Sequence, residues 1–248
     1  MRKKEYDSSQ VVAINRLTAC FTGVKSFMKI GIIGAGNIGS NAARLFVDAG
    51  HEVVISNSRG PQTLDSLVEH LGDNASAGTV EQARDFGDIV FISIPLGRYT
   101  DLTVEGWENK IVIDSNNYYP ERDGKIAELE GGKTTSSELL EQHLPGARIV
   151  KGFNTIWFEH LKTQGNKKLP LEERRAIFIA GDDSGAKETV AKLIEEIGFS
   201  AVDTGFLNEG GASQQPGTPI YNKDLTAKEA AQALENSDQW TVASGQNK

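Results

Sequence analysis

A glycine-rich loop near the start of the chain has the spacing Gly-x-Gly-x-x-Gly, in Gly34-Ala35-Gly36-Asn37-Ile38-Gly39. An apolar run precedes it and an amphipathic stretch follows it, which is the strand-to-helix context of a dinucleotide-binding turn. Gly34 permits a tight turn, Gly36 lets a pyrophosphate approach the backbone, and Gly39 lets the helix pack on the strand. The N-terminus of that helix offers free N–H groups and a positive dipole to phosphates. The loop predicts a dinucleotide site; a plain strand-to-helix turn is the alternative.

The turn after the second predicted strand indicates which dinucleotide is bound. NAD enzymes usually place Asp or Glu there, where it accepts a hydrogen bond from the ribose 2′-hydroxyl. This chain instead has no carboxylate in Ser56-Asn57-Ser58-Arg59-Gly60-Pro61. Ser58 can donate a hydrogen bond to a 2′-phosphate and Arg59 can pair with it, unless Arg59 is simply a surface residue of the turn. The turn favours NADP(H) over NAD(H).

Two further strand ends are expected at the same crevice, because ligands bind beyond the carboxyl ends of parallel strands. The first carries Ile94 and Pro95; the proline would end the strand and turn an apolar surface toward the nicotinamide half. The second is the polar run 114–120, which includes Asn116. Asn and Asp also favour turns for purely structural reasons, so both a site role and a structural role stay open for this run.

A third strand end has the sequence Val150-Lys151-Gly152-Phe153-Asn154-Thr155. Lys151 and Asn154 invite comparison with the Lys/Asn pair of β-hydroxyacid dehydrogenases, which handles a proton on the substrate hydroxyl. That chemistry depends on an additional all-helical domain for which this chain is too short. We therefore expect Lys151 at the surface or in an oligomer contact, and Asn154 and Thr155 orienting the nicotinamide amide.

Several other kinds of chemistry lack the residues they need. The histidines, at 51, 70, 143 and 160, have no metal-ligand spacing, so no metal site is predicted. Cys20 is the one cysteine and no Gly-x-Ser-x-Gly elbow occurs, so a catalytic nucleophile is not expected. The net charge of −8 argues against a nucleic acid partner. No apolar run approaches the roughly 20 residues of a membrane-spanning helix.

The hydrophobic pattern alternates short β-branched runs with amphipathic stretches from Met28 onward, as in βαβ units. We predict an α/β fold of the Rossmann type, doubly wound, with a mainly parallel sheet and a small C-terminal α/β extension. Strands are predicted over 29–33, 52–56, 89–94, 111–114, 148–152, 176–180 and 200–203, with a short edge strand over 77–79. Helices are predicted over 37–49, 61–71, 97–104, 136–143, 184–197 and 225–235, and a loop over 208–222.

The chain is divided into four parts by these patterns. Residues 1–27 are predicted to be an irregular N-terminal extension, although Leu17-Thr18-Ala19-Cys20 is similar to a lipobox. Polar residues interrupt the apolar stretch that a signal peptide needs, so Met28 is the expected functional start. Residues 28–155 would form an NADP-binding Rossmann domain and 156–237 a smaller substrate or oligomer portion on the same core. Residues 238–248 would be a tail.

Taken together, these motifs resemble the F420-dependent NADP oxidoreductases. The resemblance covers about 28–222 and is most specific at Asn57-Ser58-Arg59-Gly60-Pro61. The runs Val112-Ile113-Asp114-Ser115-Asn116-Asn117-Tyr118-Tyr119 and Lys151-Gly152-Phe153-Asn154-Thr155 are similar to the bacterial branch, as is the run from Ala180 to Gly205. The family implies hydride transfer between NADPH and a deazaflavin, with the rings aligned by the protein and no side chain acting as acid or base.

Site residues follow from the resemblance position by position. It places Ser58 and Arg59 on the 2′-phosphate, Asn37 and Ile38 along the pyrophosphate, and Ile94 with Pro95 by the nicotinamide ribose. The expected cofactor-binding set is Gly34, Gly36, Asn37, Ile38, Gly39, Asn57, Ser58, Arg59, Thr63, Ile94, Pro95, Asn116 and Asn154. The chain departs from the family where a basic residue is replaced by Gln62 or Thr63, and in a Gly- and Gln-rich C-terminal part. Because of these departures, the resemblance does not determine which molecule accepts the hydride.

Three functions remain after these observations. The first is an NADPH-dependent oxidoreductase that passes a hydride to coenzyme F420, another deazaflavin, or a flavin. The second is a non-catalytic NADP(H) sensor, since no catalytic acid is visible. The third is a β-hydroxyacid or imine reductase, disfavoured by the missing helical domain. We expect a cytoplasmic homodimer whose partner is a small-molecule redox acceptor, with no membrane partner.

Overall fold

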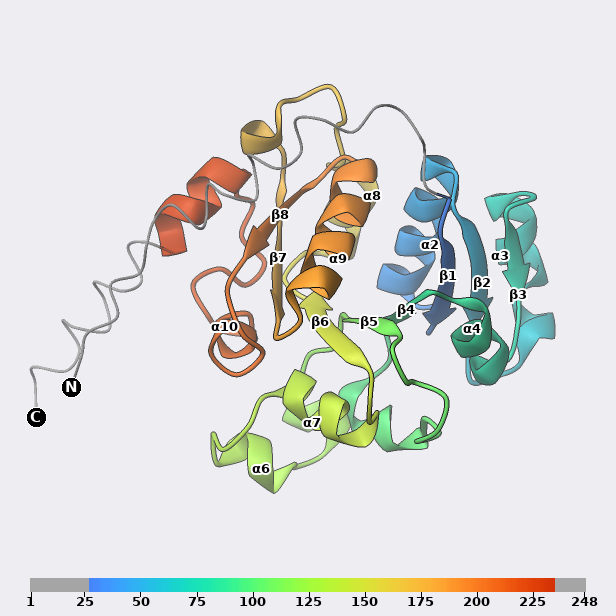
Figure 1. Cartoon of the computed structure of the whole chain (residues 1–248), viewed down its shortest axis with the longest axis horizontal. Helices are drawn as coiled ribbons and strands as arrows, with labels where there is room; N and C mark the ends of the chain where they lie inside the picture. The colour runs from blue at the N-terminus through green and yellow to red at the C-terminus, as the bar shows by residue number, and fades with distance from the viewer. Residues whose placement is uncertain (1–26, 235–248) are drawn as a thin grey trace, which may run out of the picture.

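The structure, a computed structural model, describes residues 27–234 and contains one eight-stranded sheet between layers of helices (Figure 1). The strands are β1 (Lys29–Ile33), β2 (Glu52–Ser56), β3 (Ala75–Ala77), β4 (Ile89–Ile92), β5 (Ile111–Asp114), β6 (Arg148–Gly152), β7 (Ala176–Gly181) and β8 (Ser200–Asp203). The α-helices are α2 (Asn37–Ala49), α3 (Asp65–Leu71), α4 (Val80–Phe86), α5 (Pro120–Asp123), α6 (Ala127–Glu130), α7 (Ser136–His143), α8 (Phe158–Thr163), α9 (Ser184–Glu196) and α10 (Glu209–Ser213), followed by a helical run over 227–234. Short 3-10 helices are η2 (Pro61–Leu64), η3 (Leu96–Asp101) and η4 (Leu171–Glu173).

The strand order is β3-β2-β1-β4-β5-β6-β7-β8, so β3 and β8 lie at the two edges in Figure 1. Strands β1 to β6 pair in parallel, β7 pairs antiparallel with β6, and β8 is parallel to β7. The chain builds outward from β1 to β3 and then returns to place β4 on the other side of β1. The predicted doubly wound Rossmann fold, mainly parallel, is confirmed.

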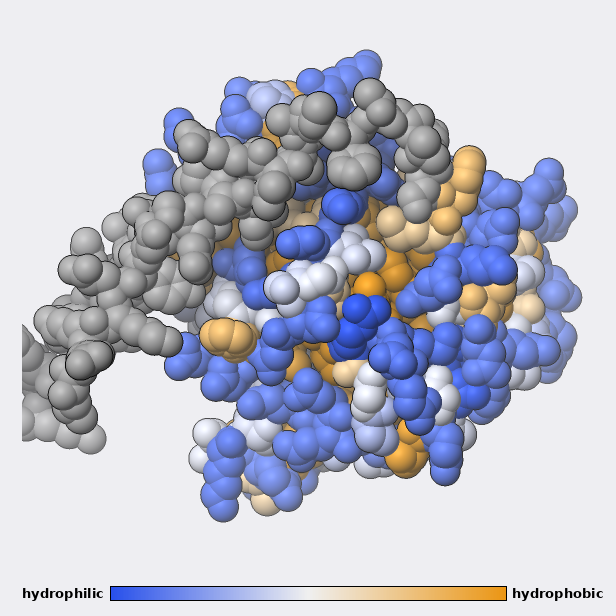
Figure 2. Space-filling view, viewed as in Figure 1, coloured by the Kyte–Doolittle hydropathy of each residue, from blue (hydrophilic) through white to orange (hydrophobic). Residues whose placement is uncertain are grey.

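Each face of the sheet has its own apolar layer, because successive strand residues point to opposite faces. Ile30 and Ile32 pack with Phe46 of α2 and with apolar residues of α9. On the other face Ile33, Val90 and Val112 pack with Trp107 and with Leu140 of α7. A smaller cluster joins β7 and β8 to Ile220 and Ala230. The surface in Figure 2 is mostly hydrophilic, with hydrophobic side chains gathered toward its middle.

The predicted elements agree with the structure except at several ends. The edge strand lies at Ala75–Ala77 rather than 77–79, and the strand predicted over 89–94 ends at Ile92. The helix predicted over 61–71 begins as η2 and continues as α3. The one predicted over 97–104 is η3, a tighter helix whose Gly97 packs so closely on Asp123 that an added Cβ would lie 2.7 Å from its carbonyl oxygen.

Some helices of the structure were not predicted from the sequence, among them α4 and α10. Helix α4 begins at a capping box, in which the Thr79 hydroxyl accepts a hydrogen bond from the Gln82 amide and the Gln82 side chain accepts one from the Thr79 amide. This Thr-x-x-Gln spacing is a recognisable signal for a helix start. The segment predicted as a loop over 208–222 contains α10. The predicted extension up to residue 26 and the tail over 238–248 lie outside the described residues, and the division into four parts stays a prediction.

Candidate cofactor and active site

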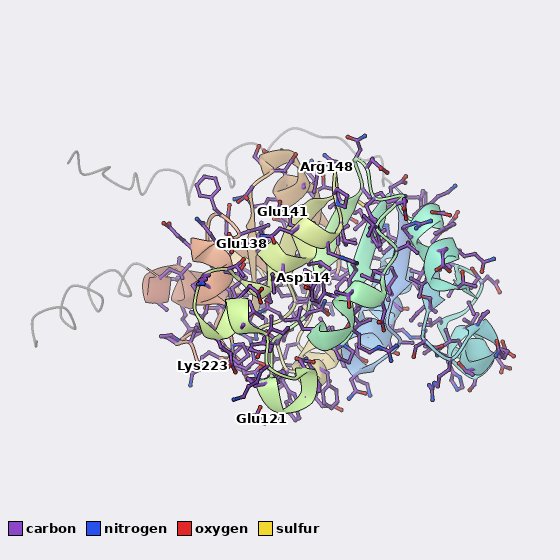
Figure 3. The ribbon with its side chains drawn as sticks, turned by 90° about the horizontal axis from the view of Figure 1, so that it is seen from below. Asp114, Glu121, Glu138, Glu141, Arg148 and Lys223 are labelled. Atoms are coloured by element: carbon purple, nitrogen blue, oxygen red, sulfur yellow. The ribbon has the colours of Figure 1, made fainter. Side chains whose placement is uncertain are left out.

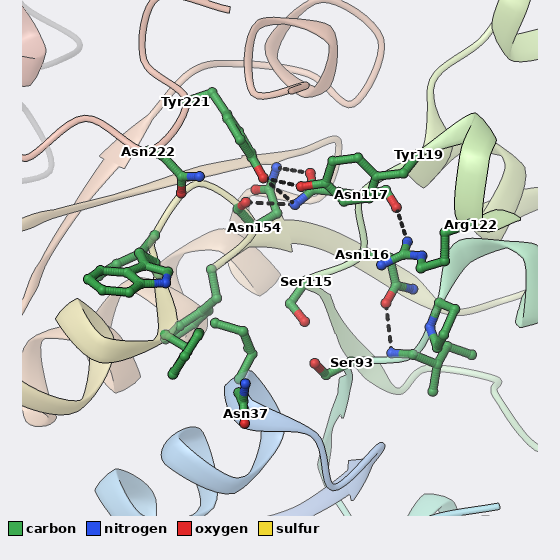
Figure 4. A pocket seen from close by; sticks show the side chains of 17 residues that line it. Asn37, Ser93, Ser115, Asn116, Asn117, Tyr119, Arg122, Asn154, Tyr221 and Asn222 are labelled. Atoms are coloured by element: carbon green, nitrogen blue, oxygen red, sulfur yellow. Dashed lines mark hydrogen bonds between the residues drawn. The ribbon is translucent and has the colours of Figure 1, made fainter. Parts of the chain in front are cut away.

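A pocket of about 400 Å³ opens at the carboxyl ends of β1, β4, β5 and β6 (Figure 4). Its position is the topological switch point of the sheet, where the chain leaves β1 in opposite directions, and doubly wound sheets bind ligands there. Six of the predicted cofactor-binding residues line it: Asn37, Ile38, Ile94, Pro95, Asn116 and Asn154. Local sequence motifs from four separate strand ends therefore meet at one site.

The glycine loop has the geometry that a phosphate-binding turn requires. Gly34 has φ of +108°, and a Cβ there would lie 2.1 Å from the Ser93 carbonyl oxygen. A Cβ on Gly39 would lie 1.9 Å from the Gly34 carbonyl oxygen, so α2 can approach the turn only without it. Around Gly36, in contrast, nothing lies within 4 Å of an added Cβ. The open space is next to the N-terminus of α2, whose first turn has no acidic residue and whose N-cap has no side-chain hydrogen bond.

The turn after β2 is ordered by hydrogen bonds among its own residues. The Asn57 Oδ1 atom accepts from the Arg59 amide at 2.9 Å, and its Nδ2 atom donates to Thr63 Oγ1 at 2.9 Å. Thr63 Oγ1 in turn donates to the Gly60 carbonyl at 2.8 Å. Ser58 and Arg59 are exposed at the tip of this turn. Asn57 and Thr63 thus shape the turn, and these four residues lie at the end of β2, outside the lining of the pocket.

Amide side chains form the inner wall of the pocket. Asn116 Oδ1 accepts from the Ile94 amide at 2.9 Å. Asn154 Nδ2 donates to Asn117 Oδ1 at 3.1 Å and to the Gln214 carbonyl at 2.8 Å, while Asn117 Nδ2 donates to the Asn154 carbonyl at 2.8 Å. Within the described residues, two buried atoms of this wall have no hydrogen-bond partner: Asn116 Nδ2, a donor, and Asn154 Oδ1, an acceptor. Unpaired buried polar atoms are costly, so they are expected where a ligand supplies the partner.

Thr155 does not share the position of Asn154. It is buried, it is not among the residues that line the pocket, and its carbonyl accepts a hydrogen bond from the Asn222 amide at 3.1 Å. That bond attaches a distant part of the chain to the end of β6. The amide-orienting role predicted for Thr155 thus has no direct contact with the pocket in this structure.

Lys151 is buried, which corrects the expectation of a surface or oligomer-contact residue. Its side chain is 0% exposed, and Nζ donates to the Asn116 carbonyl and to Ser136 and Ser137 Oγ, each at 3.1 Å. The Asp114 carboxylate, also fully buried, lies 3.7 Å away. Burial lowers the pKa of the Lys151 ammonium, and the Asp114 carboxylate opposes that shift. The physical reason for the error is that β6 is an interior strand, with helices over both faces, so a side chain at position 151 points into the core on either face.

Tyrosines and an arginine that sequence reasoning did not single out form the rim of the pocket. The hydroxyls of Tyr119 and Tyr221 are hydrogen-bonded to each other, and the Arg122 guanidinium lies 4.9 Å from the centre of the Tyr119 ring. Burial and the Tyr119 hydrogen bond raise the pKa of the Tyr221 hydroxyl far above its usual value. Arg122 is paired with Asp123. Tyr221 and Asn222 come from the segment predicted to be a loop, and no local signal marks them.

Trp157 completes the outer wall. Its side chain is 48% exposed although it lines the pocket, and its ring packs edge-on against Phe158 and His160. A large half-exposed aromatic side chain beside a pocket is the type of surface on which a flat ring can stack. The sequence signal was available, because Trp157 follows three residues after Asn154 at the same strand end.

The lining combines amide, hydroxyl, aliphatic and aromatic side chains with one guanidinium, that of Arg122. It contains no carboxylate, histidine or lysine side chain, and its ionisable members are Tyr119, Arg122 and Tyr221. The raised pKa of Tyr221 makes it a poor base at neutral pH. Among the described residues, no group of three or more His, Cys, Asp or Glu side chains could hold a metal ion. The arrangement suits binding and alignment of rings better than proton transfer.

No helix within residues 27–234 is long and apolar enough to cross a membrane. The strand order and the glycine loop are those of a Rossmann-type dinucleotide-binding protein. Residues 29–118 match the family described as NADP oxidoreductase, coenzyme F420-dependent. The chain is similar to that family over these residues, which cover β1 to β5 and the loop that follows.

Two solved structures share this fold, and a curated protein is similar to this chain in sequence. A hypothetical protein from Sinorhizobium meliloti is 33% identical, with 81% of this chain and 96% of that chain covered and a TM-score of 0.69. A putative F420-dependent NADP-reductase from an Arthrobacter species is 21% identical, with 88% and 95% covered and a TM-score of 0.61, which shows the fold. Metalloreductase STEAP3 from Rattus norvegicus is 27% identical over 74% of this chain. The chain spans 35% of that relative's length, about a third.

Proposed function

We propose that this protein transfers a hydride between NADP(H) and a flat, flavin- or deazaflavin-like acceptor. The observation that carries the proposal is the pair of unpaired amide atoms, Asn116 Nδ2 and Asn154 Oδ1, in a pocket whose lining contains no carboxylate, histidine or lysine side chain. A carboxamide group has one acceptor oxygen and a donor NH₂. The nicotinamide carboxamide therefore fits these two atoms, accepting from Asn116 and donating to Asn154.

The rest of the cofactor follows the sheet edge toward β2. The open space at Gly36 and the N-terminus of α2 would hold the pyrophosphate, with Asn37 and Ile38 beside it. Ser58 and Arg59, on the turn that Asn57 and Thr63 order, would take the 2′-phosphate. Pro95 and Ile94 would lie against the nicotinamide ribose. A carboxylate is missing from this turn, which supports NADP(H) over NAD(H).

The acceptor would enter from the side of Trp157 and Tyr221. Both are aromatic and line the outer part of the pocket, where a planar ring can stack against the exposed indole. When bound, the nicotinamide supplies the hydride; the side chains described here bind, orient and shield the two rings. Alignment of reacting groups can contribute several orders of magnitude in rate without any acid or base.

The test is a screen of acceptors, with NADPH absorbance as the readout. Deazaflavin, FMN, FAD, quinones and ferric chelates would be compared at equal concentration. We expect oxidation with at least one planar ring acceptor and a lower rate for Asn154→Ala, which removes the Oδ1 acceptor. The matched control is Asn166→Ala, an amide in the exposed 165–168 segment. Tight NADPH binding without oxidation by any acceptor would contradict hydride transfer and favour an NADP(H) sensor.

A further inference from the structure

Lys151 and Asp114 form a fully buried ion pair behind the amide side chains of the inner wall, Asn116 and Asn154. The proposed hydride transfer does not require this pair. Asp114 uses both carboxylate oxygens: Oδ1 accepts from the Asn116 amide at 2.9 Å, and Oδ2 accepts from Ser137 Oγ at 2.6 Å. Lys151 Nζ donates to the Asn116 carbonyl at 3.1 Å. In Figure 3, Asp114 lies within the ribbon beside α7, the helix that carries Glu138 and Glu141. Neither member of the pair lines the pocket.

Hydrogen bonds within the protein occupy three of the four polar atoms of Asn116. Its backbone amide is held by Asp114, its carbonyl by Lys151, and its Oδ1 atom by the Ile94 amide. The Ile94 bond also decides which end of the side-chain amide is oxygen, because a backbone N–H must meet an acceptor. Nδ2 is thereby left as the one free hydrogen-bonding atom of Asn116 within the described structure.

The same ammonium group is also linked, through Ser136, to the segment that leads to the rim. Lys151 Nζ donates to Ser136 Oγ, and that oxygen also accepts from Gln215 Nε2 at 3.2 Å. Gln215 lies in the segment that leads to Tyr221 and Asn222 on the rim. One buried cation therefore connects the Asn116 wall to the segment that carries the rim.

A buried ion pair is weak evidence for a stabilising role, because desolvation of two charges offsets their attraction. A well-packed apolar pair would hold β5 and β6 together equally well, but it could not hold the Asn116 carbonyl. We propose that Lys151 is a positioning residue, which fixes Asn116 and so sets the nicotinamide end of the cofactor site without touching the cofactor. This inference rests on the proposed function, in which Asn116 faces the nicotinamide carboxamide.

The test compares two ligands that share the adenosine half of the cofactor. 2′,5′-ADP carries the 2′-phosphate and lacks the nicotinamide, whereas NADP⁺ carries both. Lys151→Met removes the charge at similar length, and we expect it to raise the Kd for NADP⁺ about tenfold, the effect of one lost hydrogen bond to a charged partner. The Kd for 2′,5′-ADP should stay within about twofold. Lys187→Met is the matched control, since Lys187 pairs with Asp203 at 2.7 Å between α9 and β8.

A double-mutant cycle separates this role from general stabilisation. If Lys151 acts through Asn116, Lys151→Met should add little to the loss already caused by Asn116→Ala. Equal losses for 2′,5′-ADP and NADP⁺, or fully additive losses in the cycle, would overturn the inference. Because Lys151→Met leaves Asp114 as an unpaired buried charge, the variant Asp114→Asn with Lys151→Met provides a second, uncharged form with the same expected result. If Asn116→Ala leaves NADP⁺ binding unchanged, the proposed site itself fails, and the inference with it.

Discussion

The side chain of Asn116 accepts a hydrogen bond from the backbone amide of Ile94 at 2.9 Å, which joins the loops that follow β4 and β5. The two residues are 22 positions apart in sequence and approach each other because their strands are parallel neighbours. The bond occupies the side-chain oxygen of Asn116, so its side-chain nitrogen remains available to donate a hydrogen bond to a ligand. A structural contact thus determines which kind of hydrogen bond the pocket can offer.

Asn116→Ala should therefore have two measurable effects. Loss of the bond to Ile94 leaves a backbone N–H without its partner, which should lower the free energy of unfolding by about 1–3 kcal/mol. Loss of Nδ2 should weaken NADP⁺ binding and leave 2′,5′-ADP binding nearly unchanged. Denaturant titration and calorimetry measure the two effects separately. An equal loss of both ligands would show that the wall collapses as a whole.

Arg59→Ala should weaken NADPH binding by about 1.5–3 kcal/mol, the contribution of a charged hydrogen bond, and NADH binding much less. The guanidinium is exposed at the end of β2, where the proposed 2′-phosphate would lie. Arg148→Ala is the control, because Arg148 is the first residue of β6, at the end of the strand away from the pocket, and donates to the Asn109 carbonyl. Identical losses for NADPH and NADH would refute the 2′-phosphate assignment.

Gly36→Ala should mainly weaken cofactor binding, whereas Gly39→Ala, three residues away, should mainly destabilise the fold. At Gly36 the backbone is extended and the space for a Cβ is open, so the apo protein should lose at most about 1 kcal/mol while cofactor affinity falls at least tenfold. At Gly39 the Cβ would lie 1.9 Å from the Gly34 carbonyl oxygen, so the fold itself should lose about 1–3 kcal/mol. Thermal melts without and with NADP⁺ measure both changes; a Gly36→Ala protein that binds normally would place the pyrophosphate elsewhere.

We expect Asp123, which pairs with Arg122 at the rim, to contribute to the loss of folding stability at acid pH. Burial raises its pKa, but hydrogen bonds from Arg122 and from the Tyr119 and Gly97 amides outweigh that effect, and the folded pKa lies below the ordinary value of 3.8. A lowered carboxyl pKa stabilises the fold above the unfolded value, and the contribution is lost as pH falls through the folded value. Asp123→Asn should thus flatten the pH dependence of the unfolding free energy below pH 3.8.

The control for that measurement is Asp85→Asn. Asp85 also has a lowered pKa, through its hydrogen bond with Arg84, but its side chain is 63% exposed. Solvent screening should make its contribution small. A pH profile that changes equally in both variants would mean that the Asp123 network does not determine the acid response.

Sequence reasoning could place the parts of the site that depend on local signals. Each of these parts is recognised from a few adjacent residues: the glycine loop, the Asn-Ser-Arg turn, and the strand ends at Ile94, Asn116 and Asn154. Lys151 was misplaced because its environment is set by non-local pairing: β7 joins β6 from 24 or more residues away and makes β6 an interior strand. Tyr221 and Asn222 were missed for the same reason, since bonds to residues far away in the sequence hold them at the pocket: the Asn222 amide donates to the Thr155 carbonyl, and the Tyr221 hydroxyl is hydrogen-bonded to that of Tyr119.

That bond has a consequence for the order in which the protein acquires its ligand affinity during synthesis. The glycine loop and the turn at Ser58 and Arg59 leave the ribosome first, and they require only neighbouring strands. The rim requires Tyr221 and Asn222, which are translated more than 60 residues after Thr155 and then dock across the end of β6. A nascent chain should consequently recognise the adenosine phosphates of its cofactor before it can enclose the nicotinamide, and truncation between α10 and Tyr221 should produce a protein that retains the first ability alone.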